Sequence, residues 1–149
     1  MTTKNTGHDE DLKKSQQEYR NLFGNAVVGI YRSMLDGSAV LEVNQALCNI
    51  FGCTREEMLS EPATIRWADP KAREEMVKQI RKDGTVTNYA VDFINKSGEI
   101  RHCLASVRLY PQEGYMEGTI INITERMRAE EALRESNERF RKLANATWE

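Results

Sequence analysis

The chain lacks the cysteine pattern of a disulfide framework or a zinc site. Its 149 residues include only Cys48, Cys53 and Cys103, and none of them forms a Cys-x-x-Cys pair. An odd number of scattered cysteines is typical of reduced thiols in a cytoplasmic protein. The two histidines, His8 and His102, do not have the spacing of zinc ligands. We therefore expect neither disulfide bonds nor a metal site.

Long apolar runs and an excess of charge of one sign are also absent. No apolar run approaches the roughly 20 residues that a membrane-spanning helix needs, and residues 1–11 are too polar for a secretory signal. The net charge is only −2, which gives no reason to expect nucleic-acid binding. We expect a cytoplasmic protein without direct membrane insertion. Whether a longer parent protein is tethered to a membrane elsewhere stays open.

Common catalytic motifs are missing as well. The sequence has no glycine-rich phosphate loop, no Gly-x-Ser-x-Gly and no His-Glu-x-x-His. Hydrophobic residues make up 40% of the chain and charged residues 30%, which suits one domain with a modest core and a charged helical arm. No enzymatic activity is expected within these residues.

Alternating apolar residues predict five β-strands in two groups. Residues 28–34 and 40–43 form a predicted hairpin, because Asp36-Gly37 between them is a favourable turn. Three longer segments in the second half of the chain are joined by short turns and predict an antiparallel meander. They are residues 85–95, 100–110 and 115–123.

Helix-capping residues predict three helices between these two groups of strands. Asn44 is a natural N-cap for a helix of two turns. Thr54 and Glu57 have the spacing of a capping box. Asp69, followed by proline, predicts the start of a longer helix that extends to about residue 82.

Amphipathic helices are predicted at both ends of the chain. One covers residues 9–24, after a disordered start at residues 1–8, and the other covers residues 124–149. The second is strongly charged and carries a thin apolar seam with 3.5-residue spacing. The seam consists of Ala129, Leu133, Ser136, Phe140 and Leu143. Self-association through this seam and a solvated single helix both remain open.

The two terminal segments also share a sequence pattern. Leu12-x-x-Ser15-x-x-x-Tyr19-Arg20-x-Leu22 recurs as Leu133-x-x-Ser136-x-x-x-Phe140-Arg141-x-Leu143, 121 residues later. We expect the last helix to lead into the start of a second module of a longer tandem-module protein. The alternative is a chance likeness between two amphipathic helices.

The order of these elements and the residues that separate them resemble the PAS domain family, the PAS/PAC sensor and interaction modules of bacterial and archaeal signalling proteins. The resemblance covers roughly residues 19–128. It rests on Tyr19-Arg20-Asn21-Leu22-Phe23, Val28-Gly29-Ile30-Tyr31, Asp36-Gly37, Val43-Asn44-Gln45-Ala46-Leu47-Cys48, Phe51-Gly52, Thr54-Arg55-Glu56-Glu57-Met58-Leu59 and Asn122-Ile123-Thr124-Glu125-Arg126.

This resemblance implies an α+β PAS fold over residues 25–123. Its sheet is five-stranded and antiparallel, with strand order 2-1-5-4-3, short helices on one face and flanking amphipathic helices at both ends. It also implies a cavity between helices and sheet, which holds haem, flavin or a small metabolite in some members. The residues that we expect to line the cavity are Ile30, Leu47, Phe51, Trp67, Met76, Tyr89, Leu104 and Ile120. Ordinary core packing is the alternative role for them.

The resemblance further implies a signal junction where the last strand meets the C-terminal helix. The family usually has Asp-Ile-Thr at this point, followed by an acidic and a basic residue, whereas this chain has Asn122 in place of the aspartate. Asn122 can still form hydrogen bonds, but without the charge. We expect Asn122, Thr124 and Arg126 to couple the sheet to the helix, with Thr124 also acting as its N-cap.

The same comparison argues against two cofactors. Haem needs an axial ligand, and no histidine lies on a predicted helix over the cavity; His102 is predicted on the surface of the sheet. A covalent flavin adduct needs a cysteine in an Asn-Cys-Arg-Phe-Leu-Gln-like motif, and the residues around Cys48 do not match it. Cys48 is predicted to be a buried apolar residue. The cofactor, if there is one, stays unknown.

Together these features favour a sensory and relay domain of a larger signalling protein. The parent that we expect is a sensor histidine kinase of a two-component system; a diguanylate cyclase or a chemotaxis-type transducer is the alternative. Expected partners are a small-molecule ligand, a second copy through the flanking helices, and an adjacent PAS or output domain. A ligand-free dimerisation scaffold is the competing interpretation. The stimulus and the output domain cannot be deduced from the residues.

Overall fold

The computed structural model describes residues 10–14, 16–17 and 28–148. Residues 10–14 and 16–17 are helical. The rest of the helix predicted over residues 9–24 lies outside the described residues. So do the start predicted for residues 1–8 and His8 within it.

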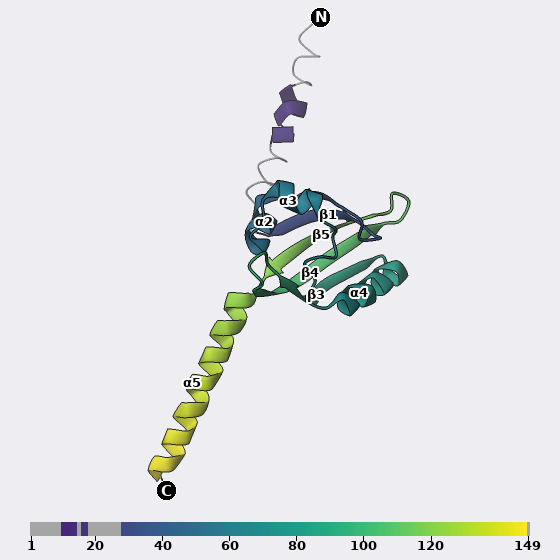
Figure 1. Cartoon of the computed structure of the whole chain (residues 1–149). Coiled ribbons are helices and arrows are strands. Elements are labelled where there is room, and N and C mark those ends of the chain that lie inside the picture. The colour runs from purple at the N-terminus through teal and green to yellow at the C-terminus, as the bar shows by residue number, and fades with distance from the viewer. Residues whose placement is uncertain (1–9, 15, 18–27, 149) are drawn as a thin grey trace, which may run out of the picture.

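Five antiparallel strands form one sheet with the order β2-β1-β5-β4-β3 (Figure 1). The strands are β1 (Gly29–Met34), β2 (Val40–Val43), β3 (Thr85–Ile94), β4 (Ile100–Tyr110) and β5 (Tyr115–Asn122). The strand β5 connects the two groups of strands, because it pairs with β1 of the hairpin on one side and with β4 of the meander on the other. The predicted α+β fold and its strand order are confirmed.

Three helices cover one face of this sheet: α2 (Gln45–Phe51), α3 (Arg55–Ser60) and α4 (Pro70–Asp83). Each begins at the predicted cap. Asn44 Oδ1 accepts a hydrogen bond from Leu47 N at 3.1 Å, Thr54 and Glu57 form a reciprocal capping box, and Asp69 Oδ1 accepts from Lys71 N at 3.0 Å. The caps satisfy N–H groups that the first turn of a helix leaves without partners.

The core lies between the helices and the sheet, because alternate residues of each strand face the helices. On β5, Met116, Gly118 and Ile120 are buried, while the residues between them face the other side of the sheet. Burying a large apolar side chain contributes about 1.5–3 kcal/mol. The core comprises Val43, Leu47, Cys48, Phe51, Cys53, Met58, Trp67, Met76, Ile80, Val86, Val91, Phe93, Cys103, Ala105, Val107, Met116 and Ile120. All three cysteines are buried free thiols.

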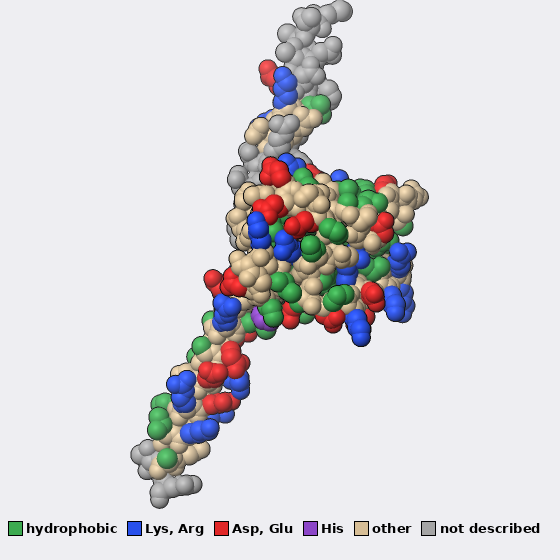
Figure 2. Space-filling model, viewed as in Figure 1, with side chains coloured by type: hydrophobic (Ala, Val, Ile, Leu, Met, Phe, Trp, Pro, Cys, Tyr) green, Lys and Arg blue, Asp and Glu red, His purple; other side chains and the backbone are tan. Residues whose placement is uncertain are grey.

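The last helix, α5 (Thr124–Trp148), continues directly from β5 and extends away from the body of the molecule (Figure 1). Figure 2 shows acidic and basic side chains along its length. Leu133, Phe140 and Leu143 of the predicted seam are 63%, 73% and 69% exposed. Among the described helices, none is both long and apolar enough to cross a membrane.

Candidate functional site

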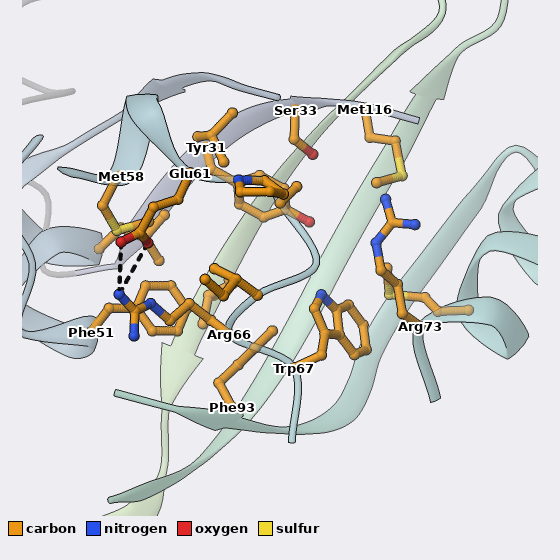
Figure 3. Close-up of a pocket in the computed structure, with 17 residues that line it drawn as sticks. Tyr31, Ser33, Phe51, Met58, Glu61, Arg66, Trp67, Arg73, Phe93 and Met116 are labelled. Carbon is orange, nitrogen blue, oxygen red and sulfur yellow. Dashed lines mark hydrogen bonds and ion pairs between the residues drawn. The ribbon is translucent and has the colours of Figure 1, made fainter. Parts of the chain in front are cut away.

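A cavity of about 60 Å³ lies between the inner face of the sheet and the three covering helices (Figure 3). Five of the residues expected to line it do so: Leu47, Phe51, Trp67, Met76 and Ile120. They come from α2, α4, β5 and the segment between α3 and α4. The cavity is therefore assembled from parts of the chain that lie far apart in sequence.

Aromatic rings form one wall of this cavity. The rings of Phe51 and Trp67 each meet Phe93 edge to face, with centroid distances of 5.3 Å and 5.1 Å. Trp67 also forms an isolated β-bridge with Phe93, which fixes the segment before α4 against β3. Edge-to-face aromatic pairs contribute about 0.5–1.5 kcal/mol beyond the area that they bury. This wall is therefore held rigidly from two directions.

Three expected lining residues lie elsewhere. Ile30 and Leu104 are not on the cavity wall; they are on the opposite face of the sheet, because β1 buries Gly29 and β4 buries Cys103 and Ala105 on the inner face. Tyr89 packs against the core but does not reach the cavity. The prediction that Ile30 and Leu104 line the cavity was therefore wrong: each is one residue away from a position that faces the helices.

The polar side chains of the cavity wall were not predicted from the sequence. Tyr31 and Ser33 come from β1, Arg73 from α4, and Glu61 and Arg66 from the segment between α3 and α4. Two signals could have found them. Tyr31 and Ser33 share the strand face of Gly29, and Arg73 precedes the buried Met76 by three residues, hence lies on the same side of the helix.

The Tyr31 side chain fits beside β5 because its neighbour on that strand is a glycine, which has no side chain. It pairs with Gly118 in the antiparallel register. A Cβ added to Gly118 would lie 3.1 Å from the Tyr31 Oη atom and 2.8 Å from the Ser106 carbonyl oxygen. Burial raises the pKa of the Tyr31 phenol well above its usual value, although the charge of Arg73 acts in the opposite direction. The phenol therefore stays protonated and able to donate a hydrogen bond.

Arg73 brings a positive charge to the cavity wall. Its Nη2 atom donates to the Leu35 carbonyl oxygen at 3.2 Å. Burial lowers the pKa of Arg73, because desolvation disfavours the charged form, and the electrostatic effects of the Tyr31 phenol group and the Asp36 carboxylate only partly oppose it. Arginine remains charged near neutral pH despite such a shift. The cavity therefore contains a cation that is partly removed from water.

A second arginine is neutralised within the wall. Arg66 Nη2 donates to both carboxylate oxygens of Glu61, at 3.2 Å and 3.0 Å, and Figure 3 shows this pair beside Phe51. The Arg66 Nε atom is buried without a hydrogen-bond partner. The Glu61–Arg66 ion pair lines the cavity and contributes no net charge to it.

The junction between β5 and α5 is a small hydrogen-bond network. The Thr124 hydroxyl accepts from His102 N at 2.9 Å and donates to Asn122 Oδ1 at 2.6 Å. Asn122 Oδ1 also accepts from Thr124 N at 3.1 Å, and Ile123 N donates to the His102 carbonyl oxygen at 2.8 Å. Thr124 is only 3% exposed. The start of α5 is thus tied to β4 as well as to β5.

Two details of the junction differ from the expectation. Thr124 is the first residue of α5, and its hydroxyl is bonded to His102 and Asn122 rather than to N–H groups of the first helical turn. Arg126 does not contact the sheet; its Nε atom donates to Glu130 Oε1 at 3.1 Å, and its side chain is 77% exposed. One turn of the helix carries Arg126 away from the strands.

His102 lies on the surface of the sheet, as predicted, and does not face the cavity. Its Nδ1 atom lies 2.7 Å from Asp92 Oδ1 on β3. Cys48 is buried in α2, where desolvation raises the pKa of its thiol. Within the part of the chain that the structure describes, no group of three histidine, cysteine or acidic residues is placed to hold a metal ion.

Comparisons with known proteins agree with this architecture. A family model described as PAS domain matches residues 25–125. The chain belongs to the PAS domain family. A comparison with curated proteins gave no match.

Solved structures with the same fold include several PAS domains. A PAS domain of an HTR-like protein from Haloarcula marismortui is 17% identical, with a TM-score of 0.66, and the match covers 79% of this chain and 99% of that one. A domain of a sensory box sensor histidine kinase/response regulator from Geobacter sulfurreducens is 22% identical, with a TM-score of 0.62, over 74% and 96% of the two chains.

A third PAS domain was solved in complex with ethanol. It belongs to a LuxR-family transcriptional regulator from Burkholderia thailandensis and is 16% identical, with a TM-score of 0.61, over 71% of this chain and 97% of that one. At these identities the likeness establishes the shared fold and leaves ligand and output to be argued from the residues.

Proposed function

We propose that this PAS domain is a sensory and relay module of a multidomain signal-transduction protein, most simply a sensor histidine kinase. It detects a small ligand or a partner and passes the change to α5. In this proposal the PAS core is residues 25–123, and residues 124–149 form an output helix that leads to an adjacent PAS or output domain in the cytoplasm. The Geobacter relative, a domain of a sensor histidine kinase/response regulator, supports the choice of parent.

One observation carries this proposal: the cavity and the output helix share the strand β5. Met116 and Ile120 of β5 line the cavity, and the same strand continues through Asn122 into α5. A ligand that favours one position of β5 therefore changes the strand that holds the start of α5. Ligands shift such an equilibrium by their differential affinity for two conformations, and about 1–3 kcal/mol is typical of allosteric coupling.

The junction network is tested by its effect on signal output. In the full-length parent protein, Asn122→Ala and Thr124→Val should uncouple output activity from the stimulus, because each removes bonds between the strands and α5. Thr85→Val, on the exposed start of β3, serves as the matched control and should signal normally. Normal stimulus response in both junction variants would contradict the relay.

A second candidate function is a dimerisation scaffold built through α5. The observation that favours it is the exposed seam of Leu133, Phe140 and Leu143, because apolar residues at 3.5-residue spacing pack against a second helix in coiled coils. Analytical ultracentrifugation tests this function. Phe140→Glu should convert a dimer to a monomer, whereas Asn145→Glu, an exposed position on the opposite side of the helix, should not. Monomeric wild-type protein at high concentration would rule the scaffold out.

A further inference from the structure

We propose that the cavity binds a small organic monoanion, namely a carboxylate of about four to six non-hydrogen atoms, with Arg73 as its counter-charge. This inference rests on the proposed role of the cavity as a ligand site and names the class of ligand. It follows from the charge, the hydrogen-bonding groups and the volume of the cavity.

Of the charged side chains on the cavity wall, one arginine has no carboxylate partner in the described part of the chain. Glu61 and Arg66 neutralise each other through two hydrogen bonds, whereas Arg73 has no carboxylate within 4.0 Å among the described residues. Asp36, the acidic residue whose charge acts on Arg73, is exposed and accepts a hydrogen bond from Ser38 N. A partly buried charge without a partner is unfavourable. An anion in the cavity would provide that partner.

The hydroxyl groups of Ser33 and Tyr31 can donate hydrogen bonds to the same anion. Ser33 and Tyr31 both line the cavity, and Ser33 is only 2% exposed. Within the described residues, no hydrogen bond of either hydroxyl is found. A hydroxyl group that faces a cavity can donate a hydrogen bond to a ligand there. A carboxylate has acceptor sites for both hydroxyls and for a guanidinium at once.

The positions of these groups also suit one ligand. Figure 3 shows the Ser33 hydroxyl entering from the sheet and the Arg73 guanidinium entering from α4, with Trp67 below them. Tyr31 lines the same cavity from β1. Three donors from two elements therefore line this cavity.

The volume limits the size of the ligand. A buried water needs roughly 10–15 Å³ of such space, so about 60 Å³ admits only a few non-hydrogen atoms. The rest of the wall is apolar, with Met76, Met116 and Ile120 facing inward. A short alkyl chain on a carboxylate fills this part and a second charge would not, which favours acetate, propionate or butyrate over a dicarboxylate.

The test measures binding of sodium propionate to the whole chain by isothermal titration calorimetry, with propionamide as the neutral match of the same shape. Propionate should bind at least about tenfold more tightly, a difference of roughly 1.4 kcal/mol. Arg73→Gln should raise the Kd of propionate at least about tenfold and leave that of propionamide unchanged. Arg81→Gln, an exposed arginine on the same helix, should leave both unchanged.

Two further variants keep the test decisive if Arg73→Gln does not fold. Ser33→Ala and Tyr31→Phe each remove one donor without creating a new group, and each should weaken propionate more than propionamide. Shifts of backbone amide resonances for residues 31–33 and 116–120 should accompany binding. Shifts confined to surface lysines would overturn the assignment of the site.

The outcomes separate this inference from the proposed function. Equal affinity for propionate and propionamide, or no binding of either, would overturn the carboxylate assignment. The relay through β5 would be untouched, because the junction variants test it through signal output with whatever stimulus the parent protein has. Loss of the relay with intact propionate binding would overturn the proposed function and leave the ligand assignment standing.

Discussion

At the scale of single residues, Asn44 joins the first covering helix to the start of β1. Its Oδ1 atom accepts from Ile30 N at 2.9 Å and from Leu47 N at 3.1 Å, while its Nδ2 atom donates to the Val28 carbonyl oxygen at 2.9 Å. The residue is 2% exposed. One side chain therefore serves as helix cap and as a bridge to β1.

Replacing Asn44 by alanine should lower the free energy of unfolding by about 2–4 kcal/mol, because the change removes a cap and leaves buried backbone groups without partners. Urea denaturation followed by circular dichroism measures this loss. The control is Asn49→Ala, at an exposed position of the same helix, which should change stability by less than about 0.5 kcal/mol. Equal effects of the two substitutions would contradict the role of Asn44.

Gly118 leaves the space that the Tyr31 side chain occupies beside the cavity. Alanine at this position should cost about 1–3 kcal/mol, because its Cβ would meet the Ser106 carbonyl oxygen at 2.8 Å and the Tyr31 ring at 3.1 Å. Thermal denaturation should show the loss, and Thr119→Ala, the next residue on the opposite face, should show less. A Gly118→Ala variant as stable as the wild type would mean that Tyr31 does not need this space.

At the scale of elements, the short helix α3 is held to the rest of the domain by a charged contact. Lys96 Nζ lies 2.6 Å from Glu57 Oε2, and Glu57 also accepts from Thr54 N at 3.3 Å. The hydrogen bond from Lys96 is the main cause that holds the pKa of Glu57 below its usual value, and the one from Thr54 adds to it. The stabilisation is therefore present above the unfolded-state pKa of the carboxyl group and is lost as the pH falls through its lower folded-state pKa.

This pH dependence leads to a prediction for Glu57→Gln. The wild type should be the more stable protein at neutral pH, because only the carboxylate form pairs with Lys96. The difference should shrink steadily under acidic conditions, once the carboxyl group is protonated in the folded state as well. Urea denaturation at a series of pH values measures it. A difference that does not vary with pH would show that the charge of Glu57 is irrelevant.

Most element boundaries could be predicted from sequence because the signals are local. Asn44, Thr54 and Asp69 mark the helix starts that the structure has, and the alternation of β4 and β5 gives the strands within one residue. The face of a strand is harder to predict. On β4 the inner residues Cys103 and Ala105 are small, so the larger Leu104 was assigned to the cavity although it lies outside.

The polar side chains of the cavity could not be predicted for a related reason. Their convergence depends on the register of β1 against β5 and on the path of the segment between α3 and α4, and neither has a local sequence signal. Ser33 and Arg73 are separated by 40 positions and line the same cavity only in the folded chain. In the sequence, Ser33 looks like any polar residue of a strand and Arg73 like any charged residue of a helix. Only the folded arrangement of their elements distinguishes them.

At the scale of the whole molecule, the domain combines a sheet with covering helices, which together form the cavity, and a helix that extends away from them. With 25 residues, α5 is about 37 Å long. Its first residue, Thr124, is buried against the sheet, so in the proposed relay a displacement of β5 moves the start of this helix. The exposed apolar residues Leu133 and Phe140 on α5 lie where a helix of a second copy can pack.

The central claim is that β5 connects the cavity to the output helix. The most direct measurement is hydrogen–deuterium exchange of the amides of residues 124–130, compared between Ile120→Val, which alters a cavity residue, and Ile121→Val, which alters the next residue on the opposite face. Exchange in α4 corrects for any global loss of stability. The account predicts faster exchange at the start of α5 in Ile120→Val alone; equal exchange in the wild type and both variants would contradict it.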